Sequence, residues 1–201
     1  MSPKVVDKPA KRIEILRSAM AVCARRGVHN FKMIDIANSA GVGKGTLYEY
    51  FTDKEDLVSG CFDLFLDDYD VFLRARLAGI VDPVTKLEVM VKASFEFFVK
   101  NRESLDILFD FWAASVRSHK GQPLMSGGSE GYSHVIDEVG GMIREGIKKG
   151  VFRPVDPKLA ANMLLALLDG LWLQSVMGLI KINSRSLPQK ISRMFLEGIL
   201  K

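Results

Sequence analysis

The chain has 201 residues, of which 48% are hydrophobic and 26% are charged. This composition excludes a wholly disordered chain and a collagen-like fibre, and the length suits one large domain or two small ones. The net charge of +4 is uneven, because residues 1–54 hold ten basic and five acidic side chains while the remainder is close to neutral. A polyanion would be attracted to the N-terminal quarter, although a solvated charged face would explain the same excess.

Apolar residues recur with helical periodicity along nearly the whole chain, and no sustained alternating run is flanked by hairpin turns. This pattern predicts an all-α fold. The first helix is expected over residues 9–26, with Pro9 in its first turn and Gly27 ending it. Its predicted apolar stripe comprises Ile13, Leu16, Met20 and Cys23.

Two short helices, residues 33–39 and 44–50, are predicted on either side of a tight turn, a spacing typical of a helix-turn-helix. Ala37 is small where the helices would cross, and Gly41 tolerates the positive φ of such a turn. The residues expected to pack inward are Ile36, Val42 and Leu47. Those left facing outward on the second helix, which can enter the major groove of DNA, are Lys44, Gly45, Thr46, Tyr48 and Glu49.

The rest of the chain is expected to form a larger helical bundle. Thr52-Asp53-Lys54-Glu55 matches a capping box, in which Thr52 and Glu55 serve the free amides of a helix reaching Leu77. Further helices are predicted over residues 83–100, 103–118, 132–149, 157–181 and 187–200. Residues 119–131 are glycine-rich and are predicted to form a mobile loop.

Charged residues interrupt every N-terminal apolar run, so no secretory signal is predicted and we expect a cytoplasmic protein. The two cysteines, Cys23 and Cys61, give no disulfide framework and are expected to be buried thiols. Residues 159–180 are apolar enough to suggest a membrane span, but Asp169 lies near their centre, where a charge costs about 2.5 to 3.5 kcal/mol. We therefore expect a buried helix and no membrane partner.

No catalytic site, cofactor or metal site is predicted. The run from Gly41 to Thr46 is similar to a phosphate-binding loop, but Asn38 stands where that motif needs its first glycine. Because none of the three histidines, His29, His119 and His134, has a His or Cys at i+3 or i+4, a zinc site has no support. No nucleophile elbow is present either, so we do not expect an enzyme.

The motif over residues 36–57 resembles the signature of the tetracycline-repressor (TetR) family, and the match is dense over residues 10–57. It rests on Ile36-Ala37, Ala40-Gly41-Val42, Lys44-Gly45-Thr46-Leu47-Tyr48, Tyr50-Phe51, Lys54-Glu55 and Leu57. The resemblance implies a homodimer in which residues 1–54 form the DNA-binding domain and read a palindromic operator in double-stranded DNA. Residues 55–201 would then form a helical domain that binds a partly apolar small-molecule effector and dimerises.

Carried over by position, the resemblance implies that Lys44, Thr46, Tyr48 and Tyr50 contact phosphates or bases and that Lys54 contacts a phosphate. With Gly45, Glu49 and Lys32, these form the predicted DNA-binding set. The sequence departs from the family pattern at Lys32 and Gly43, where hydroxyl caps are usual, and at Glu49, where His or Tyr is frequent. The Glu49 carboxylate could accept a hydrogen bond from cytosine N4 or could repel phosphate, and both alternatives stay open.

Aromatic and acidic residues of the bundle are candidates for effector contact. Asp110 and Asp169 each interrupt an apolar face, and a buried carboxylate needs a partner, which a cationic effector or a neighbouring arginine would supply. The aromatic candidates could equally be plain core. The predicted effector set is Phe98, Phe109, Asp110, Trp112, Asp169 and Trp172.

The last two helices are the choice that the resemblance implies for the dimer interface. Ala166, Gly170 and Gly178 would allow close approach of two helices, and the apolar area would come from Leu165, Leu168, Leu173, Val176 and Leu179. A core role explains these residues nearly as well. The nearly all-round hydrophobicity of residues 157–181 favours burial on two sides and hence dimerisation.

These observations together favour a ligand-responsive transcriptional regulator, a repressor released from its operator by a small molecule. One alternative is a regulator with the same architecture that activates transcription or that responds to no effector. Another is a helical small-molecule-binding protein without specific DNA binding. Binding to DNA without sequence preference would favour the latter.

Overall fold

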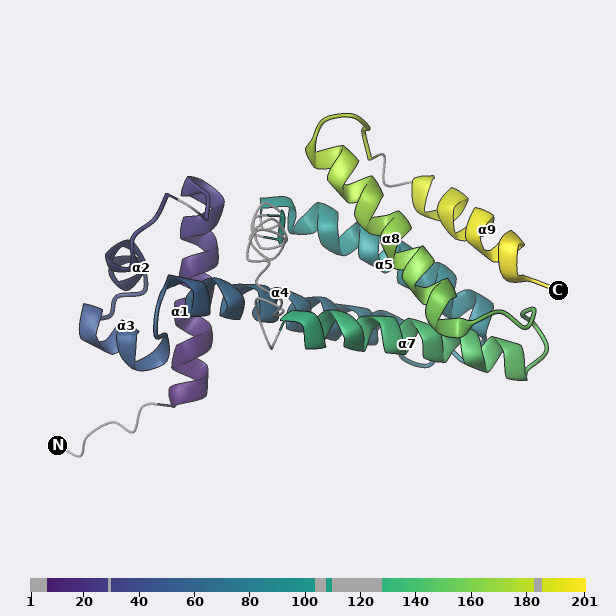
Figure 1. Cartoon of the computed structure of the whole chain (residues 1–201), viewed down its shortest axis with the longest axis horizontal. Coiled ribbons are helices and arrows are strands. Elements are labelled where there is room, and N and C mark those ends of the chain that lie inside the picture. Colours follow the sequence, from purple (N-terminus) through teal and green to yellow (C-terminus); the bar gives the residue numbers. More distant parts are fainter. Residues whose placement is uncertain (1–6, 29, 104–107, 110–127, 183–185) are drawn as a thin grey trace, which may run out of the picture. The chain divides into compact units, whose positions relative to one another are not determined.

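The computed structural model describes residues 7–28, 30–103, 108–109, 128–182 and 186–201. Within these residues the regular structure is entirely helical, which confirms the predicted fold class (Figure 1). The chain divides into two compact units. Unit 1 comprises residues 1–67 and 101–129, and unit 2 comprises residues 68–100 and 130–201. The domain boundary after residue 54 stays a prediction.

Unit 1 contains the three N-terminal helices, α1 (Lys8–Arg26), α2 (Met33–Ser39) and α3 (Lys44–Tyr50), and the start of α4 (Lys54–Leu77). The Asp7 side chain caps α1 by accepting a hydrogen bond from the Ala10 amide at 3.1 Å. α1 packs against α2, and α2 packs against α3 (Figure 1). The bounds predicted for these three helices agree with the structure to within one residue.

Two details of unit 1 differ from the sequence predictions. Ile13 is 47% exposed, because the buried face of α1 centres on Ala19 and Cys23 and Ile13 lies at its edge. The α4 capping box is displaced by one residue. Asp53 accepts from the Asp56 amide at 2.8 Å, and Asp56, not Glu55, reaches back to the Thr52 amide at 2.8 Å.

Unit 2 contains the end of α4 together with α5 (Pro83–Lys100), α7 (Gly128–Lys148) from residue 130 onward, α8 (Pro157–Val176) and α9 (Leu187–Ile199). α5 packs against α9. The segment after α7 pairs with the chain end, where the Arg153 amide donates to the Ile199 carbonyl at 2.8 Å. Phe152, fully buried, forms the adjoining antiparallel bridge with Leu200.

The predicted ends of two helices were wrong. α7 begins at Gly128 and not at residue 132, because an established helix can extend over glycines at a cost of about 1 kcal/mol each. α8 ends at Val176 and not at residue 181, because Gly178 has φ +74 and lies in the following turn. The helix predicted over 103–118 lies mostly outside the described residues, although 103 and 108–109 are helical, and so do residues 119–127 of the loop predicted over 119–131.

In the single chain α8 buries one face, and the predicted burial of its second face by dimerisation stays a prediction. Among the described residues, α8 is the one helix that is long and apolar enough to cross a bilayer. Core helices can have the same length and composition. Leu165 and Leu168 are buried in the core of unit 2. The opposite face leaves large apolar side chains exposed, namely Leu159, Met163, Leu167, Leu173 and Val176.

The junction after α7 depends on the absence of a side chain at Gly146. A Cβ at this position would lie 2.0 Å from Cδ2 of the buried Phe152 ring. We therefore expect Gly146→Ala to lower the free energy of unfolding by about 1 to 3 kcal/mol, the cost of overpacking, measured by urea denaturation followed by circular dichroism.

Gly141→Ala in the same helix is the matched control, since a Cβ there would meet no atom within 4 Å. The better helix propensity of alanine should raise stability by about 0.5 to 1 kcal/mol. Equal effects of the two substitutions would contradict the steric role of Gly146.

Candidate nucleic-acid interface and effector site

The outer side of α3 carries most of the predicted DNA-binding residues. Lys44, Gly45, Tyr48 and Glu49 are exposed, and Thr46 and Tyr50 are half-buried. α3 is anchored by Leu47, which is fully buried with Ile36 and Ala37 of α2. Val42, predicted to pack inward, is half-buried. One short helix therefore presents hydroxyl, ammonium and carboxylate groups from a fixed apolar base.

The turn between α2 and α3 is closed by backbone groups. Gly41 has φ +64, a conformation that favours glycine, and the Val42 amide donates to the Ala37 carbonyl at 2.9 Å. Gly43 begins α3 without a side-chain cap. A Cβ at Gly45 would meet no atom within 4 Å, so packing within the protein does not require a glycine there.

Lys32 lies at the start of α2, and its side chain is exposed. Its amide donates to Asp35 Oδ2 at 2.8 Å, and Asp35 also pairs with Arg26 of α1 at 3.1 Å. The hydrogen bond from the Lys32 amide, followed by the Arg26 charge, lowers the pKa of Asp35. Asp35 thus fixes the entry to α2 and leaves the Lys32 ammonium at the surface.

Lys54 has a structural contact at the start of α4. Its ammonium donates to the Phe31 carbonyl at 3.1 Å and lies 4.2 Å from the centre of the Phe31 ring. The sequence predicts that Lys54 contacts a phosphate. If it does, its ammonium would bind both the phosphate and the Phe31 carbonyl in the loop before α2. Since this contact joins residues 23 apart, it gives no signal in the sequence.

Two basic residues that were not in the predicted set lie near the end of α3. A surface hollow of about 400 Å³ is lined by Lys8, Pro9, Arg12, Glu49 and Tyr50. The Arg12 guanidinium lies 5.0 Å from the centre of the Phe51 ring. The only sequence signal for Lys8 and Arg12 was the basic excess of the N-terminal quarter.

The predicted effector residues are only partly brought together. Asp169 and Trp172 of α8 and Phe98 of α5 all belong to unit 2, where the Phe98 and Trp172 rings lie 5.1 Å apart. Phe95, which the predicted set omitted, lies 5.3 Å from Trp172. Phe109 is half-buried and belongs to unit 1. Asp110 and Trp112 lie outside the described residues.

Asp169 is a half-buried carboxylate whose hydrogen-bond donor is the Tyr132 hydroxyl of α7. Burial raises the pKa of Asp169, and the hydrogen bond from Tyr132 opposes that shift. Within the described residues no basic side chain pairs with this carboxylate. Ionised Asp169 therefore carries a charge that a cation could compensate.

Polar groups around Asp169 sit among aromatic rings. Tyr69 of α4 shares a hydrogen bond of 2.7 Å with Ser94, and burial raises the pKa of Tyr69 to about 12. The Tyr69 ring stacks on Phe98 at 5.9 Å. The Trp172 Nε1 is buried and has no hydrogen-bond acceptor among the described residues. Aromatic faces and a carboxylate in one unit are the chemistry that recognises organic cations.

Two family models match the chain. Residues 15–61 match the model of bacterial regulatory proteins of the tetR family, and residues 83–200 match the C-terminal model of BetI-type transcriptional repressors. The first match covers the helix-turn-helix, and the second covers α5, α7, α8 and α9 in full.

Curated relatives and solved structures agree with these models. The HTH-type transcriptional regulator BetI of Serratia proteamaculans is 27% identical over 178 residues, covering 87% of this chain and 85% of the relative. A transcriptional regulator from Saccharomonospora viridis, solved in complex with choline, is 25% identical with a TM-score of 0.81, covering 96% of this chain and 100% of that one. FadR from Bacillus subtilis, solved with stearoyl-CoA, shares the fold at 23% identity and a TM-score of 0.78, covering 93% and 98%.

Proposed function

The chain belongs to the TetR family and is a transcriptional regulator, and we propose that α3 is its DNA-reading helix, inserted into the major groove of a palindromic operator. The observation that carries this proposal is that polar and charged side chains of α3 are exposed on the side opposite the buried Leu47. Gly45 leaves room for close approach of the DNA backbone, and Lys44 supplies a charge for phosphate. No bond is made or broken, so the protein acts by binding alone.

Repression requires two states of the dimer with different DNA affinity. An effector that binds more tightly to the state unable to contact both half-sites shifts the population away from the operator. A coupling of about 1 to 3 kcal/mol between effector and DNA gives useful control.

Simultaneous replacement of Lys44 and Tyr48 by alanine tests the role of α3. With an operator selected from a random duplex library, we expect an affinity loss of at least about tenfold, because a phosphate charge and a hydroxyl contact are both removed. Lys44→Ala alone should reduce the salt slope of binding by about one unit. Fluorescence anisotropy at several salt concentrations measures both effects.

Lys92→Ala removes one exposed charge from α5 and serves as the control. It should leave operator affinity and salt slope unchanged. If no operator sequence is enriched, or if the double variant binds as tightly as the wild type, α3 is not the reading helix.

We further propose that the effector is an organic cation held in unit 2. Asp169 supplies a negative charge without a basic partner among the described residues, and Phe95, Phe98 and Trp172 of the same unit supply a cluster of aromatic faces. The relative from Saccharomonospora viridis, solved with choline, supports the same ligand class. A quaternary ammonium ion suits such a site, since it is attracted to carboxylates and ring faces without needing hydrogen bonds.

Asp169→Asn tests this ligand class, because it keeps the shape of the side chain and removes its charge. We expect choline to bind the variant at least about tenfold more weakly, as measured by isothermal titration calorimetry. The neutral isostere 3,3-dimethylbutan-1-ol should bind the two proteins equally. Equal affinity of the wild type for choline and the isostere would exclude a cation site.

We propose that α8 and α9 form the homodimer interface through their exposed apolar face. The residues of this face are Leu159, Met163, Leu167, Leu173, Val176, Met177 and Met194. A second copy of the chain suits it, because regulators of this family act as dimers and the face repeats along α8 at helical spacing.

Met163→Lys places a charge on this face at a side chain that is 61% exposed in the single chain. We expect the dimer dissociation constant to rise at least about tenfold, measured by analytical ultracentrifugation. Val71→Lys changes an equally exposed residue of α4 and should leave the dimer intact. A dimer that resists Met163→Lys would place the interface elsewhere.

A further inference from the structure

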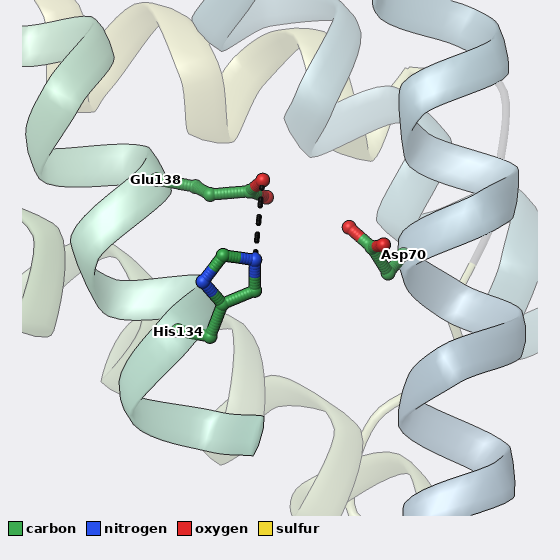
Figure 2. A group of neighbouring side chains, drawn as sticks. All are labelled: Asp70, His134 and Glu138. Carbon is green, nitrogen blue, oxygen red and sulfur yellow. Dashed lines mark ion pairs between the residues drawn. The ribbon is translucent and has the colours of Figure 1, made fainter. Parts of the chain in front are cut away.

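Three potential metal ligands meet between α4 and α7 within unit 2. Asp70 projects from α4, and His134 and Glu138 project toward it from successive turns of α7 (Figure 2). Their donor atoms lie within 4.8 Å of one another. His134 Nε2 and Glu138 Oε1 are 3.5 Å apart, close to the separation of about 3.4 Å between two tetrahedral ligands of a zinc ion.

The Arg74 guanidinium lies between the three potential ligands and contacts each of them. Its Nε donates to Asp70 Oδ1 at 2.8 Å, and its Nη2 donates to Glu138 Oε1 at 3.2 Å and lies 3.3 Å from His134 Nε2. One cationic group thus contacts all three donors. The three side chains are therefore already placed to accommodate a positive charge between them.

The side chains have enough freedom to close around a smaller cation. His134 is 58% exposed at its side chain, and Asp70 and Glu138 are about half as exposed. Arg74 is also largely exposed, so its side chain can turn into solvent without breaking the core. Exposed ion pairs of this kind contribute little stability, so their loss costs little.

We propose that Asp70, His134 and Glu138 form a three-ligand site for a divalent transition-metal ion of the zinc type, which takes the place of the Arg74 guanidinium. One imidazole nitrogen and two carboxylates match the ligands of zinc, cobalt and nickel, whereas magnesium and calcium prefer oxygen alone. The two carboxylates neutralise the ion, and water completes its coordination. The bound ion ties α4 to α7.

The sequence gives little signal for this group of ligands. Glu138 lies one helical turn from His134, at i+4, where a carboxylate is common on any exposed helix. The third ligand, Asp70, lies 64 residues away along the chain and could not be paired with His134 by spacing.

Cobalt(II) is the probe for the test, because its visible absorption reports the ligands that it binds. Untagged, full-length, chelator-treated protein is titrated with Co²⁺, followed by absorption and calorimetry, and then with competing Zn²⁺. We expect one saturable site per chain, displaced by Zn²⁺. His134→Gln and Glu138→Gln should each weaken binding at least about tenfold.

Arg74→Gln separates a metal site from a plain ion-pair network. If the metal replaces the guanidinium, removing the competing cation should tighten Co²⁺ binding by about threefold to tenfold. Glu197→Gln, which removes the acid of the exposed Arg193–Glu197 pair at the same i,i+4 spacing on α9, is the control and should bind as the wild type does.

Circular dichroism checks that each variant is folded, which the exposure of His134 favours. Absence of saturable binding in both the wild type and Arg74→Gln overturns the proposal. So does binding that His134→Gln and Glu138→Gln leave unchanged, which would locate the metal at other groups. Zn²⁺ should also raise the unfolding temperature of the wild type and not that of His134→Gln.

Discussion

A seven-residue helix has no stability of its own, and the proposed DNA-reading surface consists of one. α3 exists because Leu47 is buried with Ile36 and Ala37, and because the turn around Gly41 fixes its approach to α2. The contacts of Asp35 with Arg26 and of Lys54 with Phe31 hold the elements on either side. The exposed side chains of Lys44, Tyr48 and Glu49 are not part of this buried base, so they can vary without removing it.

Charge is handled differently in the two units. At the helix-turn-helix, the Asp35 carboxylate is engaged by the Lys32 amide and Arg26, and the side chains of Lys32 and Lys44 are exposed. In unit 2, the acidic side chains of Glu145 on α7 and Asp169 on α8 are both half-buried. Glu145 is paired with Lys149 and Lys86, which lower its pKa to about 2, whereas the Tyr132 phenol is the only partner of the Asp169 carboxylate among the described residues. This contrast makes Asp169 the acid whose balance a ligand can change.

The sequence allowed the helices and the helix-turn-helix to be predicted, because their signals are local. Pro9, Gly27 and Gly41 act on their own neighbours, and burial of Leu47 follows from its position in one turn of helix. Contacts between distant residues had no such signal. The hydrogen bond of Tyr132 to Asp169 spans 37 residues, and that of Arg74 to Glu138 spans 64. The assignment of Glu55 to the capping box failed for another reason, since Asp56 offered a competing carboxylate one residue later.

The pairing of α5 with α9 also sets the order in which the protein can fold. α1, α2 and α3 contact neighbours within a few dozen residues, so they can assemble soon after they leave the ribosome. The packing partner of α5 is α9, residues 187–199, and the bridge partner of Phe152 is Leu200. Neither contact can form before these residues have been synthesised. The three N-terminal helices can thus form while the bundle of unit 2 is still open. Unit 2 can therefore close only after residues 187–200 have been synthesised.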